Sequence, residues 1–437
     1  MGWLFEPAIP MPEPVYIIDG ARTPFLKARN RPGPFSASDL ATAAGRALLV
    51  RQRFAPGDLD EVILGCASPS ADEVNIGRVV ALRMGCGLKV PGWTVMRNCA
   101  SGMQALDSAL ANIRSGRSNL VLAGGTDALS RAPLLVSDAM VEWLADWYAA
   151  NSLAARARLL AKFKLRHLAP VIGIMKGLTD PMVGLLMGQT AENLAFRFGI
   201  TRRAMDEFAA ESHRRVLAAQ QGGDFADEIV ALYDGKGALY AADDGVRADS
   251  TVANLARLRP FFDRKYGNVT AGNSSQITDG AAWLVLASER AVEKYGLEPR
   301  GRIVDSEWAG LDPGEMGLGP VHAATPILRR HGLRLDDLDA WEINEAFAAQ
   351  VIACERAWND DGYCTKELGL DAPLGQLDAA KLNVDGGAIA LGHPVGASGA
   401  RIVLHLLHVL ERDGGRRGMA AICIGGGQGG AMLIERG

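Results

Sequence analysis

The chain has 437 residues, of which 48% are hydrophobic and 22% are charged. This composition is typical of a compact globular protein and argues against a disordered or fibrous chain. The formal net charge of −4 argues against the basic surface of a nucleic-acid-binding protein. Six cysteines without a C-x-x-C pair argue against a disulfide scaffold or a zinc finger, and favour a reducing compartment.

The beginning of the chain shows no targeting pattern. Its first fourteen residues contain no Lys or Arg, which fits neither a secretory signal nor a transit peptide. No apolar run reaches the roughly 18 residues that a membrane span needs. We therefore expect a soluble cytoplasmic protein.

Short β-branched runs alternate with longer helical patterns along the chain. This alternation predicts a layered α/β fold. The runs predicted to be strands are 15–18, 62–64, 120–122, 283–286, 341–343 and 420–424.

A helix is predicted directly after Cys99. Apolar residues recur at helical spacing from Met103 to Ile113, and Gly116 follows as a C-terminal cap. Cys99 is thereby placed at a helix N-terminus, where the helix dipole and free N–H groups favour a thiolate. A lone cysteine is also commonly an inert buried residue, so this feature alone leaves both interpretations open.

The same order of features recurs near the C-terminus. A glycine-rich turn that holds His393 precedes a predicted helix at 397–410 and the strand at 420–424. Both copies end in glycines, at 123–126 and at 425–428. This repetition predicts a duplicated architecture in which two similar halves face each other across a shared site.

Residues from about 131 to 262 interrupt this scheme and are predicted to form an inserted subdomain. Within it, the stretch 151–170 has five Arg or Lys, no acidic residue and several Leu and Phe. One interpretation is an amphipathic helix that binds a membrane or a partner. The other is the solvated basic face of a core helix.

Polar groups follow two further predicted strands. Cys423 ends one strand, directly before glycines whose N–H groups can serve an oxyanion or simply form a tight turn. Asn344 and Glu345 follow another, at the strand terminus where α/β folds tend to bind ligands. Each of these features also has a purely structural interpretation. The same holds for His393 as a histidine in a loop.

Together these segments resemble the thiolase family. Cys-Ala-Ser-Gly begins at Cys99, Asn-Glu-Ala-Phe at Asn344, Gly-His-Pro-x-Gly at Gly392 and Cys-x-Gly-Gly-Gly at Cys423, which is the family's order. Further matching segments extend the resemblance over most of the chain; they lie at 21–23, 187–192, 270–275 and 279–281.

The resemblance implies a duplicated thiolase fold with layers in the order α-β-α-β-α and mixed sheets. It places an N-terminal domain at 14–290, which contains the inserted loop subdomain at about 131–262, and a C-terminal domain at 291–437. It also implies a homo-oligomer that takes acyl-CoA and CoA as substrates. No metal or redox cofactor is implied, because the chemistry needs only thiols, an imidazole and aligned dipoles.

The resemblance also implies three reacting side chains. Cys99 is expected to attack the substrate carbonyl and carry the acyl group, with His393 activating its thiol. Cys423 is expected to be the acid/base that acts on the carbon α to the thioester, through a thiol near neutral pKa.

Two developing oxyanions need separate donors. By resemblance, His393 and a water held by Asn344 stabilise one, and the N–H groups of Cys99 and Gly425 stabilise the other. Glu345 is expected to support that water and its neighbours.

Five residues are expected to contact substrate by resemblance. Ser275 and Met316 match positions that line the pantetheine or acyl path, and Phe347 and Met187 belong to matching segments. Leu186 occupies a position where thiolases specialised for acetoacetyl-CoA carry a histidine. An apolar side chain there favours a longer or bulkier acyl group.

The substrate prediction is thiolytic cleavage of 3-ketoacyl-CoA to acetyl-CoA and a shortened acyl-CoA. The insertion around 140–185 is similar to that of thiolase subunits of the fatty-acid β-oxidation trifunctional complex. A hydratase/dehydrogenase partner subunit or a membrane surface is therefore expected to contact residues 131–185. The alternative is an acetoacetyl-CoA thiolase that runs the Claisen condensation.

Three other classes of protein share part of this pattern. β-Ketoacyl synthases have the cysteine and the glycine-histidine loop but use a Cys-His-His set, which Asn344 and Cys423 do not fit. A cysteine hydrolase would use Cys99, Asn344 and His393, although papain-like enzymes place these types in another order. A silent lipid-binding or scaffold subunit would use the fold only for assembly.

Overall fold

The computed structural model describes residues 13–437. The prediction that the chain has no targeting signal rests on its first fourteen residues. These lie almost wholly outside the described part of the chain. Among the helices of residues 13–437, none is both long and apolar enough to cross a bilayer.

One mixed ten-stranded sheet runs through the molecule. Its first half comprises β1 (Val15–Arg22), β2 (Leu26–Lys27), β3 (Glu61–Gly65), β4 (Gly92–Val95), β5 (Leu120–Ala128) and β10 (Thr278–Ala287). Its second half comprises β11 (Gly301–Gly310), β12 (Ala340–Ile343), β13 (Arg417–Ile424) and β14 (Gln428–Arg436). The halves join where β1 pairs with β11, with Val15 opposite Ile303.

The two halves repeat one topology. The order β1-β10-β5-β3 of the first half has its counterpart in the order β11-β14-β13-β12 of the second. In each half the first two pairings are antiparallel and the third is parallel. The predicted duplication is therefore confirmed at the level of strand order and direction.

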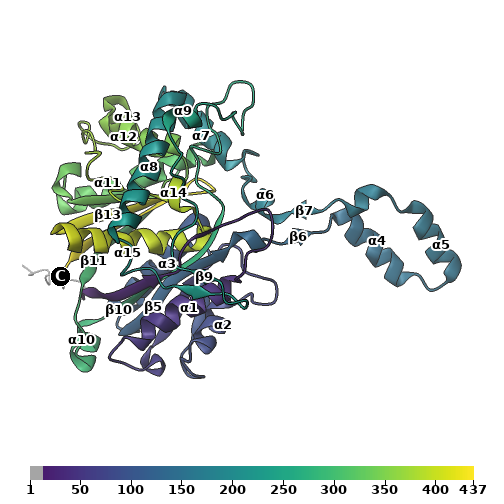
Figure 1. Cartoon of the computed structure of the whole chain (residues 1–437), viewed down its shortest axis with the longest axis horizontal. Helices are drawn as coiled ribbons and strands as arrows, with labels where there is room; N and C mark the ends of the chain where they lie inside the picture. The colour runs from purple at the N-terminus through teal and green to yellow at the C-terminus, as the bar shows by residue number, and fades with distance from the viewer. Residues whose placement is uncertain (1–12) are drawn as a thin grey trace, which may run out of the picture.

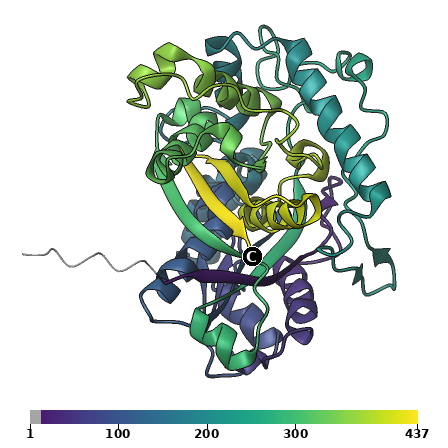
Figure 2. The same cartoon turned by 90° about the vertical axis from the view of Figure 1, so that its left-hand side faces the viewer.

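Two helices form the central layer between the halves of the sheet. They are α3 (Ser101–Arg114) and α15 (Val395–Asp413), which pack on each other and on strands of both halves. Helices α1 (Ala37–Val50) and α2 (Ile76–Arg83) cover the outer face of the first half, and α11 (Gly319–His331) and α12 (Ala348–Asn359) cover that of the second. Figure 2 shows this succession of helix and sheet layers, and the predicted layer order is confirmed.

Further helices and a two-stranded sheet complete the body. They are α7 (Met187–Arg197), α8 (Arg202–Gly222), α9 (Val252–Leu255), α10 (Glu289–Tyr295), α13 (Asp361–Lys366), α14 (Ala388–Leu391), β8 (Leu232–Tyr233) and β9 (Leu239–Tyr240). Of these, α7 and α8 belong to the predicted insertion yet pack on α12 in the body.

The part of the insertion from β6 (Leu134–Leu135) to α6 (Gly173–Gly177) forms an arm that projects from the body (Figure 1). Its stem pairs β6 with β7 (Val171–Ile172), and its head contains α4 (Asp138–Ala149) and α5 (Leu153–Lys162), with α6 at its base. Trp143 stacks on Trp147 with centroids 5.3 Å apart and meets Phe163 at 4.9 Å. No residue of α4 or α5 is buried, so the interpretation of 151–170 as one face of a core helix is wrong.

Candidate active site

The N-termini of α3 and α15 meet at glycines. A Cβ on Gly102 would lie 2.8 Å from the carbonyl oxygen of Gly396, and one on Gly125 would lie 1.9 Å from that oxygen. Real side chains do not tolerate such distances, so glycine is required for the two helices and β5 to approach here. This contact brings the segment that holds Cys99 against the helix that follows His393.

Cys99 lies in a single 3₁₀ turn (Asn98–Ala100) directly before α3. Asn98 adopts a φ of +43°, and its side-chain amide donates a 2.8 Å hydrogen bond to the carbonyl oxygen of Gly425. The Ser101 hydroxyl closes the turn by donating to the Asn98 carbonyl at 2.7 Å. These bonds hold Cys99 against the turn that joins β13 to β14.

The surroundings of the Cys99 thiol favour its protonated form. Burial raises its pKa above the usual value, although the N–H groups of Gly425 and of Cys99 itself act in the opposite direction. The local N–H groups thus act in the predicted direction, but burial outweighs them and the net shift is upward. The same two N–H groups are those predicted to hold an oxyanion.

His393 presents one nitrogen without a protein partner. Its Nδ1 lies 2.6 Å from the Ser398 hydroxyl, which donates to the Pro394 carbonyl at 3.1 Å and therefore accepts from the imidazole. The proton is thereby assigned to Nδ1, which leaves Nε2 as an acceptor. Nε2 is buried without a hydrogen bond to any residue in 13–437, and burial together with the nearby Arg401 lowers the pKa of His393 to about 4.

Cys423 is the penultimate residue of β13 and lies opposite Gly429 of β14. The intervening turn is possible because Gly426 and Gly427 adopt φ values of +95° and +74°. Burial raises the pKa of the Cys423 thiol well above its ordinary value, and the neighbouring Cys99 adds to this shift. The pKa of this thiol in the free protein therefore lies above the near-neutral value that was expected.

Asn344 and Glu345 follow β12 and are almost completely buried. Both amide atoms of Asn344 lack a hydrogen-bond partner within the described part of the chain. Glu345 instead accepts from the Ser212 hydroxyl at 2.7 Å, the Asn383 amide at 2.9 Å and the Ile389 N–H at 3.2 Å. An unpartnered buried amide is costly unless water or substrate satisfies it, so Asn344 is available to such a ligand.

The residues predicted to contact substrate lie on segments around this site. The Ser275 N–H donates to the Ala346 carbonyl at 2.9 Å, which fixes that segment beside Phe347. Met187 lies over the glycine turn, its sulfur 3.0 Å from where a Cβ on Gly425 would be. Leu186 precedes it at the start of α7 and is partly buried.

Met316 differs from these residues in its surroundings. It is 3% exposed and belongs to the apolar core of the second half together with Phe347. Its predicted position on the substrate path stays a prediction.

Sequence reasoning gave no role to three residues that hold the site together. Asn383 has a φ of +46°, and its side chain bonds both the backbone of Ile343 and Glu345. Ser398 lies in the same glycine-rich segment as His393, so its role could have been suspected there. Ser212 lies in the middle of α8, far away in the chain, and no local signal could have identified it.

Comparisons with known proteins agree with this architecture. The family model described as "Thiolase, N-terminal domain" matches residues 15–290, and that described as "Thiolase, C-terminal domain" matches 297–436. A β-ketoadipyl-CoA thiolase of Pseudomonas aeruginosa is 42% identical over 436 residues, which is 98% of this chain and 100% of that protein. A 3-ketoacyl-CoA thiolase of Yersinia enterocolitica is 36% identical and covers 96% of each chain.

Solved structures are similar over nearly the whole length. Human mitochondrial 3-ketoacyl-CoA thiolase in complex with CoA has a TM-score of 0.83 at 36% identity, over 97% of this chain and 98% of that one. An acetyl-CoA acetyltransferase of Bacillus anthracis also has a TM-score of 0.83, at 37% identity, over 97% and 99% of the two chains. These matches favour the thiolase interpretation over a cysteine hydrolase or a β-ketoacyl synthase. The chain belongs to the thiolase family of acyltransferases.

Proposed function

We propose that this thiolase cleaves 3-ketoacyl-CoA with CoA, releasing acetyl-CoA and a shortened acyl-CoA through an acyl-Cys99 intermediate. The observation that carries the proposal is Nε2 of His393, which is buried in the region that holds Cys99 and has no hydrogen-bond partner among residues 13–437. A protonated thiol needs such an acceptor at the moment of attack. The CoA-bound human relative supports CoA as the second substrate.

In the first half-reaction, Nε2 of His393 takes the Cys99 proton and Sγ attacks the 3-keto carbon. The N–H groups of Cys99 and Gly425 stabilise the oxyanion that forms. The bond between C2 and C3 then breaks, and its electron pair remains on C2 of the acetyl-CoA enolate. The enolate oxygen is stabilised by His393 and by a water on Asn344, whose amide has no protein partner among the described residues.

Cys423 balances the protons in both half-reactions. Its thiol protonates C2 of the enolate, and acetyl-CoA leaves. The resulting thiolate accepts the proton of the incoming CoA thiol, which then attacks the acyl-Cys99 thioester. Cys99 departs as a thiolate and recovers its proton from His393, so the cycle consumes no net proton. The high pKa of Cys423 in the free protein suits the protonation of a carbanion.

We propose an apolar acyl chain as the substrate group. The segment 172–187, which ends at Leu186 and Met187, is mostly aliphatic. Its one cation is Lys176, and its one acid, Asp180, accepts the N–H groups of Met182 and Val183 within a turn. This composition suits an apolar chain better than the terminal carboxylate that the name of the Pseudomonas relative implies for its substrate.

Steady-state thiolysis across a series of 3-ketoacyl-CoAs tests the proposal. We expect turnover of substrates with six or more carbons, a lower kcat/KM for β-ketoadipyl-CoA, and loss of activity in Cys99→Ala. Turnover of acetoacetyl-CoA alone would indicate the acetoacetyl-CoA thiolase instead. Preference for β-ketoadipyl-CoA would overturn the assignment of the acyl group, and activity in Cys99→Ala would overturn that of the nucleophile.

We further propose that the arm binds the surface of an anionic membrane. Its distal apolar side chains are exposed, with Tyr148 82%, Leu153 86% and Leu165 85% accessible. The stretch 151–170 adds five basic residues and no acid. Exposed leucines beside basic groups fit a lipid surface. The cytoplasmic location, the homo-oligomeric state and a partner subunit stay predictions.

A further inference from the structure

The carboxylate of Asp127 ties together three segments beside the site. Asp127 lies near the end of β5 and is fully buried. Its oxygens accept from the Ser68 N–H at 2.9 Å, the Ala67 N–H at 3.3 Å, the Cys66 thiol at 3.3 Å and the Gly396 N–H at 2.5 Å. One side chain thus joins β5, the segment after β3 and the first turn of α15.

The sheet explains why these groups meet. Strands β3 and β5 are parallel neighbours, with Gly65 opposite Gly125, so the residues that follow both lie at the same edge. Helix α15 begins at that edge, and the positive end of its dipole favours a carboxylate. Asp127 therefore occupies a place where an anion is stabilised, although it lies in neither of the family-matched segments that hold Cys99 and His393.

The imidazole lies just before α15, and its hydrogen-bond partner lies in the first turn of that helix. His393 precedes Gly396 by three residues, and Ser398, whose hydroxyl accepts the hydrogen bond from Nδ1, follows it by two. We propose that Asp127 is a positioning residue for the acyl transfer, whose carboxylate fixes this turn and thereby the direction of His393 Nε2. The inference rests on the role proposed above for His393.

The negative charge of Asp127 also acts on the thiol of Cys99. Burial raises its pKa to about 6, while the N–H groups of Ser68 and Gly396 and the Cys66 thiol oppose that rise. The titratable groups around it are the thiols of Cys66 and Cys99, with Glu73 beyond Cys66, and α15 contributes backbone N–H groups. The negative charge raises the pKa of Cys99, so it opposes thiolate formation even as it holds the base.

Asp127→Asn separates these two effects. The amide keeps the shape but presents an NH₂ group to N–H donors, so the turn is no longer held. We expect kcat to fall about a hundredfold, as for a displaced catalytic group, with KM for CoA unchanged. Alkylation of Cys99 by iodoacetamide should not slow, because the charge that disfavours the thiolate is gone.

Glu61→Gln is the matched control. Glu61 is also a buried carboxylate, on β3 but at the end away from the site, and it accepts from Asn112 at 2.7 Å, Ser118 at 2.8 Å and Trp93 at 3.0 Å. A kcat of Asp127→Asn within about twofold of that of Glu61→Gln would overturn the proposal. If Cys99→Ala is inactive in the same assay, the proposed function stands while the positioning role fails.

Cys66→Ala provides a second test that does not depend on Asp127→Asn folding. Removing the thiol takes away a hydrogen bond that lowers the pKa of Asp127. Because the ionised carboxylate is the form that holds the turn, the acid limb of the kcat profile should lie near pH 6 in the wild type. It should move upward by about half a unit in Cys66→Ala. An acid limb that does not move would contradict the proposal.

Discussion

The Ser398 hydroxyl decides which nitrogen of His393 carries the proton. Because Ser398 donates to Pro394, it accepts from Nδ1 and leaves Nε2 free. Ser398→Ala removes that acceptor, so the tautomer with Nε2 protonated becomes accessible. We expect kcat to fall by about tenfold or more with little change in KM, and Ser398→Thr, which keeps a hydroxyl, to retain most activity. Steady-state kinetics of both variants decide this; equal rates for Ala and wild type would contradict the assigned tautomer.

At the residue scale, sequence reasoning found the groups expected to react but not those that orient them. Cys99 and His393 lie in short segments whose residue types are unusual together, so they were visible without a structure. Ser212 reaches Glu345 across 133 positions of the chain, and such a contact leaves no local pattern. The resting pKa values of both cysteines were also misjudged, because the degree of burial depends on packing around the whole site.

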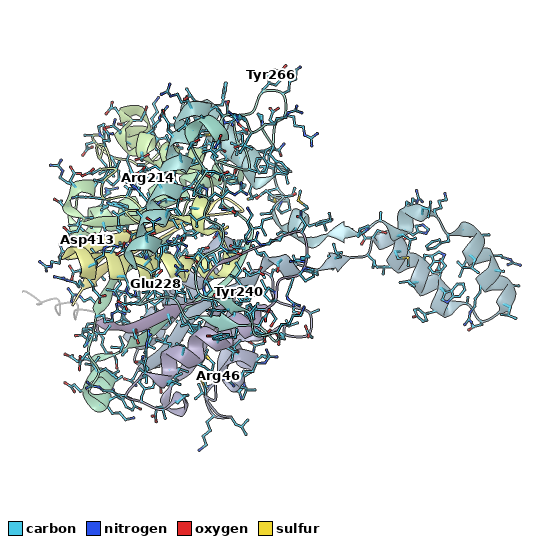
Figure 3. All side chains as sticks on the ribbon, viewed as in Figure 1. Arg46, Arg214, Glu228, Tyr240, Tyr266 and Asp413 are labelled. Carbon is cyan, nitrogen blue, oxygen red and sulfur yellow. The ribbon has the colours of Figure 1, made fainter. Side chains whose placement is uncertain are left out.

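At the scale of a single element, helix α15 carries a buried charged side chain, His405, in addition to Ser398 of the candidate site. His405 lies between the carboxylates of Glu228 and Asp385, at 3.1 and 3.2 Å, and Glu228 also pairs with the buried Arg22. Glu228 is labelled in Figure 3, where it lies close to α15. Burial alone would lower the pKa of His405, but Glu228 and Asp385 raise it to about 10. This imidazole is therefore charged in the folded protein at neutral pH.

The raised pKa predicts how stability depends on pH. The stabilising contribution of the charged His405 is complete below its unfolded pKa of about 6.5 and is lost as pH rises towards 10. Across this window the wild type should lose about 1 kcal/mol of unfolding free energy per pH unit from this group. His405→Gln should flatten that slope. His408→Gln is the control, because the pKa of His408 is lowered by burial; urea unfolding from pH 7 to 10 that gives equal slopes for all three proteins would refute this.

Some strands were easier to predict from the sequence than others. All six predicted runs lie within strands, whereas β2, β4, β11 and β14 of the main sheet and the two-residue strands β6, β7, β8 and β9 were missed. Strand β11 is mostly only partly buried and mixes charged with apolar residues, and β14 begins with glycines. Charged residues interrupt β11, so it lacks the continuous apolar run by which the buried central strands were recognised. Strand β14 does contain such a run, at 431–434, which was overlooked.

At the scale of the whole molecule, the arm is the part whose position the sequence could not predict. Charge and apolar content indicated an insertion with a basic amphipathic stretch, but not that both its helices stand away from the body (Figure 1). Its side chains extend along the outside of α4 and α5 (Figure 3). A small aromatic cluster, in which Trp143 also donates to the Leu159 carbonyl at 3.0 Å, helps to hold the head together. Substitutions in such an arm can alter what it binds without disturbing the main sheet.

The membrane proposal predicts that binding and catalysis separate. Reversing the charges of Arg158 and Lys162 should release the protein from phosphatidylcholine vesicles that contain phosphatidylglycerol, because attraction to anionic lipid amounts to about 1 kcal/mol per basic residue. The kcat for thiolysis should stay unchanged, since α5 has no buried residue. Reversal of Arg264 and Lys265, exposed on the body, changes the net charge equally and should leave vesicle binding intact. Cosedimentation that is equal for both double variants, or that occurs equally on vesicles without phosphatidylglycerol, would show that the arm does not recognise an anionic surface.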